Sequence, residues 1–363
     1  MKFNCKYGII FLIVGLCAFV SFYGGKQQWK NVEYVTVYAL SQSIFQNRKE
    51  VIVMAIIKKE AYYNSSTGVN KIRALIWLDD EVEHVGVFQI AHGVSEHIDR
   101  YDHFARFLAE RGYVVCGNDH IGHGKTVSSP EDLGFTAEED GFRRFVDDMH
   151  ILYNIMHKRY PELNYYLFGH SMGSFCARVY AGTFSEELSG LIICGTGQAP
   201  QGLEFAINSL RELTQKVGTR TRNKIMAGAL NKISSLGIKD KTSELDWLSF
   251  NKKNVEDYKN DPLCGIELTV AGMRDLGSIA LLASDKLWPA SVRVGLPILI
   301  ISGAEDPIGM NGKGPVACAD SLIACGHEPE VIIYPGMRHE ILNEEENEKV
   351  YLDILGFLNT ASF

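Results

Sequence analysis

The sequence lacks the features by which several classes of protein are recognised. It has no long basic run, and its 36 Lys and Arg residues against 44 Asp and Glu residues give a formal net charge of −8. A nucleic-acid-binding surface needs clustered positive charge to contact phosphates, so the composition argues against a nucleic-acid partner. The chain also contains no internal repeat and no low-complexity tract, which excludes repeat architectures.

The chain also lacks the cysteine pattern of a disulfide framework. Its eight cysteines are scattered along the chain and include no C-x-x-C pair. Cys116, Cys176 and Cys194 fall in apolar segments, where a free thiol behaves as a small hydrophobic side chain. This usage is more typical of a reducing compartment than of a disulfide-stabilised secreted domain.

Apolar segments of strand and helix length alternate through most of the sequence. With 363 residues and 46% hydrophobic content, the chain is long enough for one large α/β core and an inserted segment. Alternating strands and helices predict a mostly parallel central sheet flanked by helices, and we expect this domain to cover residues 54–363.

One short motif predicts a nucleophile. Gly169-His170-Ser171-Met172-Gly173 lies between an expected strand at 165–168 and an expected helix at 175–183. A serine hydroxyl becomes reactive when a strained strand-to-helix turn holds it beside a base and backbone donors. The glycines at 169 and 173 would permit that turn, because side chains there would collide. Ser171 is therefore the predicted nucleophile.

The expected partners of this serine follow it in the order acid, then histidine. The buried strand predicted at 296–302 ends in a turn that contains Asp306, and the strand predicted at 330–334 leads into a loop that contains His339. We expect His339 to be the base and Asp306 to orient it. The alternative assignments are Glu305 and Glu340, which we expect to be solvated.

The oxyanion hole of such a site takes one backbone amide from the residue after the nucleophile and one from a loop after an earlier strand. Met172 would supply the first amide. The strand predicted at 85–91 leads into a loop in which Val94 is the expected second donor, and Gly93 would let the backbone approach the substrate. Both donors are main-chain groups.

A histidine-rich loop containing Asp119 follows the strand predicted at 113–117. It could be interpreted as part of a metal site, since several histidines are available: His92, His97, His103, His120 and His123. Metal binding would require three or four of these ligands to converge. We instead expect Asp119 and the loop glycines to brace the oxyanion loop, with no metal.

Five motifs together carry a family resemblance that runs from Tyr62 to Leu358: HGVSEH at 92–97, NDHIGHGKT at 118–126, FGHSMGS at 168–174, SGAEDPIG at 302–309 and RHEILNE at 338–344. The chain resembles the monoacylglycerol lipase and lysophospholipase group of α/β-hydrolases, which carries the serine aminopeptidase-type domain. The resemblance implies an esterase acting on single-chain glycerolipids without a metal or organic cofactor. It also implies a lid inserted before the strand that carries the acid, and a triad of Ser171, Asp306 and His339.

Two alternatives to ester hydrolysis remain at this point. The same nucleophile could serve a thioesterase, amidase, transacylase or perhydrolase, because the sequence does not reveal how water competes with other acceptors. A hydrolase fold can also act as a non-catalytic binding scaffold. The complete triad argues against the second alternative.

Residues 198–295 interrupt the alternation of strands and helices and are the predicted helical lid. Within them, residues 203–217 show helical spacing, with an apolar side predicted from Leu203, Phe205, Ala206, Leu210 and Leu213. The apolar residues expected to line a substrate channel are Trp247, Leu248, Phe250 and Leu276. This lid is one candidate surface for membrane association.

The second candidate is the amino-terminal extension, residues 1–53, whose apolar segment 7–23 is short for a membrane span and long for a signal-peptide core. If this extension is translated, we expect a membrane-anchored enzyme. The codons of residues 49–51 can encode a bacterial ribosome-binding sequence just upstream of Met54. Translation from Met54 would give a cytoplasmic enzyme instead.

Overall fold

The computed structural model describes residues 56–223, 235, 238 and 241–361. Met54–Phe363 form one compact unit. The apolar segment 7–23, Met54 and the rest of the predicted extension lie outside the described residues. Within the described ranges, no helix has the length and apolar character needed to cross a membrane.

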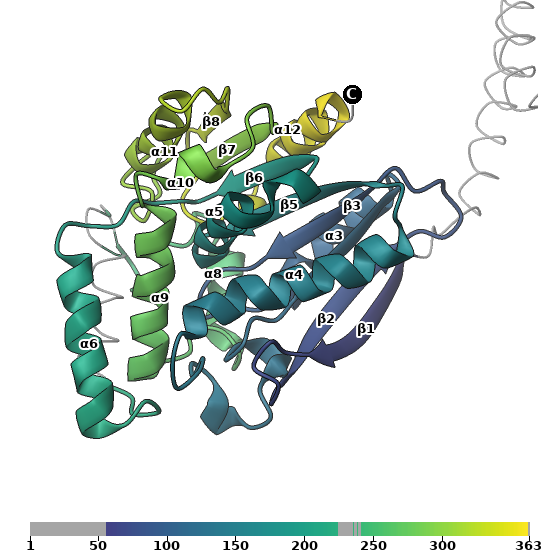
Figure 1. Cartoon of the computed structure of the whole chain (residues 1–363). Helices are drawn as coiled ribbons and strands as arrows, with labels where there is room; N and C mark the ends of the chain where they lie inside the picture. Colours follow the sequence, from purple (N-terminus) through teal and green to yellow (C-terminus); the bar gives the residue numbers. More distant parts are fainter. Residues whose placement is uncertain (1–55, 224–234, 236–237, 239–240, 362–363) are drawn as a thin grey trace, which may run out of the picture. The chain divides into compact units, whose positions relative to one another are not determined.

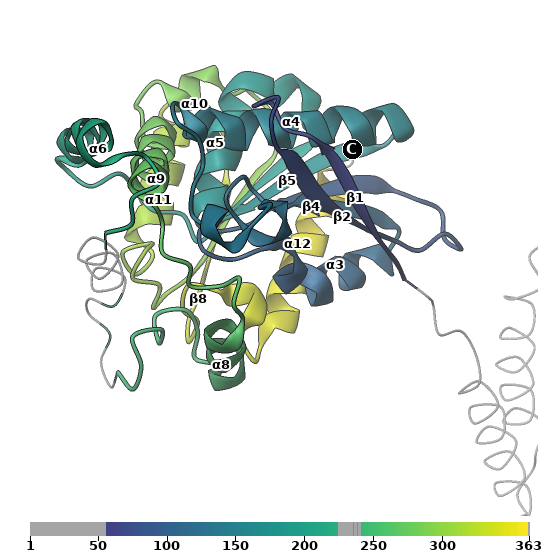
Figure 2. The ribbon, with the colours of Figure 1, turned by 90° about the horizontal axis from the view of Figure 1, so that it is seen from below.

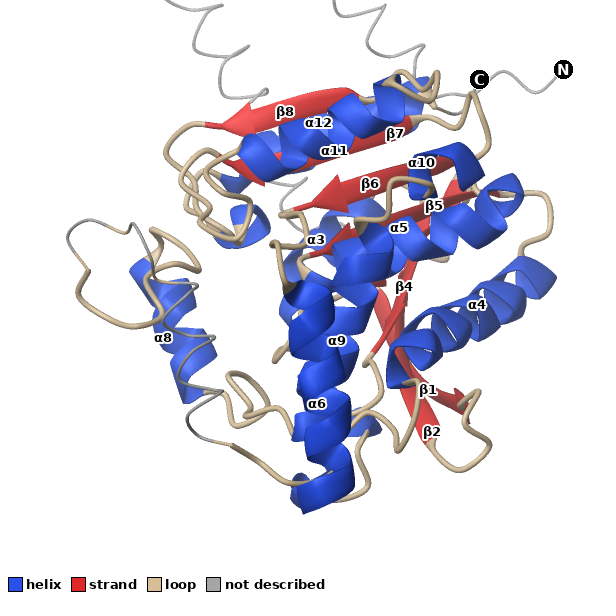
Figure 3. Cartoon of the chain, turned by 60° about the vertical axis from the view of Figure 1, so that its left-hand side comes forward, coloured by secondary structure: helices blue, strands red, loops and turns tan. Residues whose placement is uncertain are grey.

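A sheet of eight strands forms the centre of this unit (Figure 3). The strands follow the spatial order β1-β2-β4-β3-β5-β6-β7-β8. The pairings of β2 with β1 and with β4 are antiparallel, and the remaining pairings are parallel. The expected mostly parallel sheet is therefore confirmed. The strands are β1 (Ile57–Asn64), β2 (Lys71–Leu78), β3 (Gly86–Ala91), β4 (Tyr113–Asn118), β5 (Asn164–His170), β6 (Gly190–Cys194), β7 (Ile298–Gly303) and β8 (Glu330–Tyr334).

Helices cover both faces of the sheet (Figures 1 and 2). The helices are α3 (Asp102–Ala109), α4 (Gly141–Arg159), α5 (Met172–Phe184), α6 (Leu203–Val217), α8 (Lys252–Asn260), α9 (Val270–Ala283), α10 (Trp288–Ser291), α11 (Lys313–Ile323) and α12 (Asn347–Thr360). One apolar core lies between the sheet and α4, α5, α10 and α11, and a second core lies between the opposite face and α3 and α12.

Two-sided burial explains why the central strands are apolar at nearly every position. In β7, Ile298 and Ile300 join the first core, whereas Leu299 and Ile301 join the second. Successive side chains of a strand point to opposite faces, so a sheet covered on both sides selects apolar residues at odd and even positions alike. This pattern predicted the five strands β3, β4, β5, β7 and β8, and their predicted bounds differ from the observed ones by two residues or fewer.

The chain between β6 and β7 forms an inserted segment that contains α6, α8, α9 and α10. Helix α6 packs on α9, and α9 packs on α4 and α5 (Figure 1). The predicted bounds of α6 are confirmed, but its predicted apolar side is wrong in part. Ile207 is the buried residue of this helix, whereas Phe205 is 77% exposed. Phe205 lies two positions from both Leu203 and Ile207, which is more than half a helical turn away from their shared face.

Candidate active site

Ser171 occupies a strained turn between β5 and α5. Its backbone torsion angles are φ 54° and ψ −119°, in a region that residues with a side chain rarely adopt. Hydrogen bonds hold the turn: the Ser171 amide donates to the Cys194 carbonyl over 3.0 Å, and the Ser174 hydroxyl donates to the Ser171 carbonyl over 2.6 Å. Strain of this kind persists only where the surrounding structure enforces it, and it concentrates at functional sites.

The two glycines of the motif allow this turn because the backbones around them are in close contact. A Cβ atom on Gly169 would overlap the Gly173 carbonyl, and a Cβ atom on Gly173 would overlap the Ala91 carbonyl at the end of β3. The second contact brings the start of α5 against the loop that follows β3. The sequence therefore needs glycine at both positions, as predicted from the motif.

Asp306 and His339 meet across the ends of the neighbouring parallel strands β7 and β8. His339 Nδ1 lies 3.0 Å from Asp306 Oδ2, and both side chains are buried. Asp306 is itself fixed, since its Oδ1 accepts the Ile308 amide over 2.9 Å and its Oδ2 accepts the Ser302 hydroxyl over 3.2 Å. The acid that faces the histidine is thus Asp306.

The electrostatic surroundings of His339 favour its protonated form. Burial alone would lower the pKa of the imidazole, but the carboxylate of Asp306 and, more weakly, those of Glu340 and Glu96 outweigh burial and raise this pKa above its ordinary value of 6.5. The neighbouring His170 ring, whose centroid is 4.7 Å away, stays neutral because burial and His339 lower its pKa to about 3.

The remaining ring nitrogen of His339 is available for chemistry. Nε2 is buried and has no hydrogen-bond partner in the part of the chain that the structure describes. The hydrogen bond from Ser171 to Nε2 that a complete triad requires is therefore not formed among these residues. In enzymes without substrate, catalytic hydrogen bonds are often long and tighten only when substrate binds.

The predicted oxyanion loop lies directly against the serine. A Cβ atom on Gly93 would be 3.1 Å from Ser171 Cβ, so a side chain at this position would crowd the nucleophile. The Gly93 amide donates to Glu96 Oε1 over 2.6 Å, which fixes the loop. Val94 is half-buried next in the chain. Met172 is the first residue of α5, where a helix leaves its amide without an intrahelical acceptor.

Asp119 contacts the oxyanion loop through its buried carboxylate. Oδ1 accepts the Ile98 amide over 2.9 Å, and Oδ2 accepts the Lys125 amide over 2.8 Å and Arg73 Nη1 over 3.0 Å. Ile98 directly follows the HGVSEH motif. The carboxylate therefore ties the loop after β4 to the end of the loop after β3.

Three buried histidines pack beside this contact as neutral side chains. His92 Nε2 accepts the His120 amide over 2.9 Å, so its proton lies on Nδ1, which donates to the Gly93 carbonyl over 2.7 Å. Burial, reinforced by His120 and His123, lowers the pKa of His92 well below its ordinary value. Within the described ranges, His92, His120 and His123 do not form a group of converging metal ligands.

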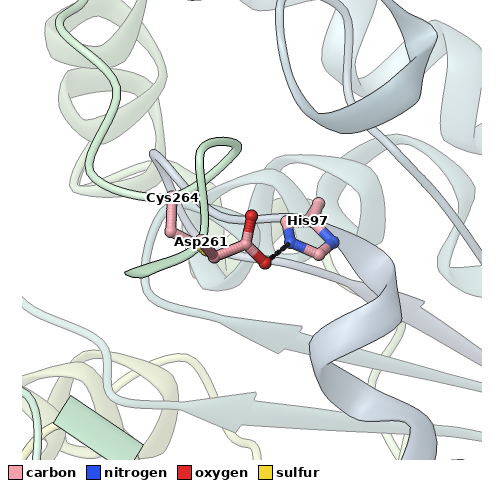
Figure 4. A group of neighbouring side chains, drawn as sticks. All are labelled: His97, Asp261 and Cys264. Atoms are coloured by element: carbon pink, nitrogen blue, oxygen red, sulfur yellow. Dashed lines mark hydrogen bonds and ion pairs between the residues drawn. The ribbon is translucent and has the colours of Figure 1, made fainter. Parts of the chain in front are cut away.

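A different trio could offer ligand atoms to a metal ion. His97, Asp261 and Cys264 present a nitrogen, an oxygen and a sulfur within 4.8 Å of one another (Figure 4). Two of these groups already engage each other, since His97 Nε2 lies 2.8 Å from Asp261 Oδ2. Asp261 and the nearby Asp99 raise the pKa of His97 in spite of its burial, which favours an ion pair between His97 and Asp261.

The two alternative acids have different environments. Glu305 is exposed, as expected, and accepts the Gly336 amide over 3.1 Å. Glu340 was expected to be solvated, and this expectation is wrong: its side chain is 4% exposed and is paired with Arg100. Sequence reasoning missed Arg100 altogether. The sequence alone does not distinguish a buried arginine from a solvated one. The one indication that Arg100 could be paired was the number of acidic residues close to it in the sequence.

The inserted segment forms one wall of the site. Trp247 lies beside His339 with 5.2 Å between ring centroids, and the Leu248 carbonyl accepts the Glu340 amide over 2.8 Å. The other predicted channel residues lie elsewhere. Leu248 packs in a small buried cluster, Leu276 packs on the main core, and Phe250 lies under the Arg338 guanidinium.

Comparisons with known proteins identify related enzymes. The chain is 27% identical to a monoacylglycerol lipase from Mycolicibacterium smegmatis over 301 residues, which cover 81% of this chain and 96% of the relative. It is 28% identical to the monoglyceride lipase of Homo sapiens over 260 residues, which cover 70% of this chain and 75% of the relative.

A solved structure of a thermostable carboxyl esterase from Bacillus coagulans superposes with a TM-score of 0.80 at 30% identity, covering 84% of this chain and 99% of the esterase. The family model described as "Serine aminopeptidase, S33" matches residues 82–346, which is well over half of the chain. The chain therefore belongs to the serine aminopeptidase S33 family and is a carboxylic-ester hydrolase with the α/β-hydrolase fold.

Proposed function

We propose that the protein cleaves a single-chain glycerolipid ester, a monoacylglycerol or a lysophospholipid, through an acyl-enzyme on Ser171. The observation that carries this proposal is the buried Asp306–His339 pair. It lies on loops at the carboxyl ends of parallel strands, and Ser171 occupies its strained turn at the carboxyl end of another strand of the same sheet. This arrangement supplies an orienting acid, an imidazole with a free Nε2 and a nucleophile on neighbouring loops.

The first half-reaction forms the acyl-enzyme. His339 Nε2 takes the hydroxyl proton as Ser171 Oγ bonds to the ester carbonyl carbon, and the resulting imidazolium then gives this proton to the departing glycerol oxygen. In the second half-reaction, His339 Nε2 takes a proton from water as the water oxygen bonds to the acyl carbon. The bond between Ser171 Oγ and the acyl carbon then breaks to release the fatty acid, and the imidazolium returns its proton to Ser171 Oγ. Asp306 keeps the Nδ1 proton in place and offsets the charge of the imidazolium.

The oxyanion of each tetrahedral intermediate needs donors that are already in position. In this proposal, the backbone amides of Val94 and Met172 supply them. The hydrogen bond from the Gly93 amide to Glu96 supports this role, because it fixes the loop so that the following amide is pre-organised beside Ser171. The side chains of the two donors should be replaceable.

The lipid substrate is supported by the relatives' names and by the inserted segment. We assign residues 198–295 as a lid that covers the serine and contacts lipid surfaces. Phe205 on α6 is 77% exposed, and Leu287 before α10 is 74% exposed. We infer that these exposed apolar side chains contact acyl chains at a membrane or micelle surface.

A substrate panel tests the proposed function. Purified protein is assayed with monoacylglycerols of increasing chain length, lysophospholipids, acyl thioesters and short p-nitrophenyl esters. We expect kcat/KM for a long-chain monoacylglycerol or lysophospholipid to exceed that for acetate esters. A preference for acetate esters or for thioesters would contradict the lipid assignment, and failure of a fluorophosphonate probe to label Ser171 would indicate a binding scaffold.

A further inference from the structure

We propose that Arg100 is a positioning residue that holds the oxyanion loop and the histidine loop together through two buried carboxylates and sets the balance of charge around His339. This inference rests on the proposed function, since it assigns catalytic roles to both loops. The feature involved is a buried cluster of Glu96, Arg100 and Glu340, called here the glutamate–arginine bridge.

The bridge consists of one guanidinium between two carboxylates. Arg100 Nη1 lies 2.7 Å from Glu96 Oε2 and 2.6 Å from Glu340 Oε1, and Nη2 lies 2.7 Å from Glu340 Oε2. The side chain of Arg100 is 10% exposed, and each glutamate side chain is 4% exposed. Paired and bidentate contacts of this kind are strong and directional, and they restrict the relative position of the groups they join.

Each carboxylate acts on one of the two catalytic loops. Glu96 Oε1 accepts the Gly93 amide over 2.6 Å and the Tyr101 hydroxyl over 2.8 Å, so it fixes the residue that precedes the proposed oxyanion donor. Glu340 is the residue next to His339 and is separated from Arg100 by 240 positions in the sequence. The bridge therefore links the loop after β3 to the loop after β8.

The inserted segment completes the surroundings of the bridge. Asn254 of α8 donates to Glu340 Oε2 over 2.7 Å and accepts from Arg100 Nη2 over 3.0 Å. The Arg100 guanidinium also lies over the Tyr258 ring at 4.9 Å. Together with the ion pairs, these contacts engage Nη1 and Nη2 of Arg100 and both oxygens of Glu340, as a buried ion pair requires.

The bridge also determines the charge near His339. The charged and titratable groups that face this imidazole are Asp306, Glu340, Glu96 and the neutral His170, and both glutamates act to raise the pKa of His339. Burial opposes ionisation of Glu340, but Arg100 outweighs it and lowers the pKa of this carboxyl to about 2. Glu340 thus stays ionised, with the guanidinium of Arg100 as its cationic partner.

Opposite charge changes should therefore shift the pH profile in opposite directions. His339 must be neutral to accept a proton, so kcat/KM falls as the pH drops through its pKa. Arg100→Gln removes the compensating cation, so at pH values at which Glu340 is still ionised the pKa of His339 should rise and the acid limb should move to higher pH. Glu340→Gln replaces the carboxylate by a neutral amide of nearly identical shape. Loss of this negative charge should lower the pKa of His339 and move the acid limb to lower pH.

The experiment measures kcat and KM from pH 5 to pH 9 for the wild type, both variants and Arg100→Lys. We expect kcat of Arg100→Gln to fall by about tenfold or more while KM changes by less than about threefold, because the residue orients catalytic groups without contacting substrate. Arg100→Lys should keep the acid limb close to that of the wild type but lose part of kcat, since lysine preserves the charge without the bidentate geometry.

A matched control separates positioning from general loss of stability. Arg106 of α3 pairs with Asp102, and its side chain is half-exposed. Arg106→Gln should therefore leave both kcat and the acid limb unchanged. If Arg100→Gln does not fold, Glu340→Gln still tests the inference. Unshifted acid limbs, or shifts of the same sign in both variants, would overturn it. Retained activity in Ser171→Ala would instead refute the proposed function.

Discussion

Replacing Asp306 by asparagine should disable the enzyme without changing the shape of the site. The Ile308 amide donates to Oδ1, so the asparagine oxygen must remain there to accept it. The new NH2 group then takes the place of Oδ2, which lies 3.0 Å from His339 Nδ1. A donor in this position requires Nδ1 to be an acceptor, and the histidine proton moves to Nε2, where it blocks acceptance of the serine proton.

The expected loss in kcat is about 10⁴-fold, which is the effect of the wrong tautomer in serine triads and corresponds to about 5.4 kcal/mol. Loss of the Asp306 charge also removes the largest influence that raises the pKa of His339, so the residual activity should have its acid limb at lower pH. Steady-state hydrolysis of a long-chain monoacylglycerol between pH 5 and pH 9 measures both effects.

Glu305→Gln is the matched control for this substitution. Glu305 precedes Asp306 in the same turn but is exposed. Its side chain accepts a hydrogen bond from the Gly336 amide, which a glutamine oxygen can also accept. We expect its kcat to stay within about twofold of the wild type. An Asp306→Asn enzyme within tenfold of wild-type kcat, or an equally large loss in Glu305→Gln, would refute the assignment of the acid.

Three further substitutions test other parts of the site. Ser171→Ala should lower ester turnover by at least about 10³-fold with an unchanged melting temperature, and unchanged turnover would mean that the nucleophile is another residue. Gly173→Ala should lower the free energy of unfolding, measured by urea titration, by about 1–3 kcal/mol, because the new Cβ atom would overlap the Ala91 carbonyl. The control Gly356→Ala should not destabilise the fold, because a Cβ atom there would have no neighbour within 4 Å. Phe205→Ser should weaken co-sedimentation with phosphatidylcholine vesicles while stability changes by less than about 0.5 kcal/mol, and undiminished binding would exclude α6 as the lipid contact.

Local signals in the sequence predicted most of the fold. Strand β8 and helix α6 have the predicted bounds, because an unbroken apolar run predicts the strand, helically spaced apolar residues predict the helix, and clear breaks end both. The turn at Ser171 was also predictable, since only glycine fits at positions 169 and 173. These features depend on neighbours in the chain, so the sequence around them contains the necessary information.

Burial of polar residues was less accessible to sequence reasoning. Glu305 and Glu340 each follow a strand and neighbour a catalytic candidate, yet Glu305 is exposed and Glu340 is buried. The same difficulty affected α6. Phe205 is strongly hydrophobic and was therefore assigned to the apolar face of the helix, but its side chain is exposed. The residue type indicates whether a side chain prefers to be buried or exposed, but the surrounding tertiary structure decides whether it is buried.

The sequence by itself determined five of the strands, helices α5 and α6, and the residues expected to react, because these follow from apolar patterns, glycine positions and residue chemistry. Only the tertiary structure decided that Asp306 contacts His339 and that Arg100 joins Glu96 to Glu340. These contacts link positions 33 and 240 residues apart. They depend on which loop ends converge at the edge of the sheet, and the buried charges there are stable only because each finds an opposite partner.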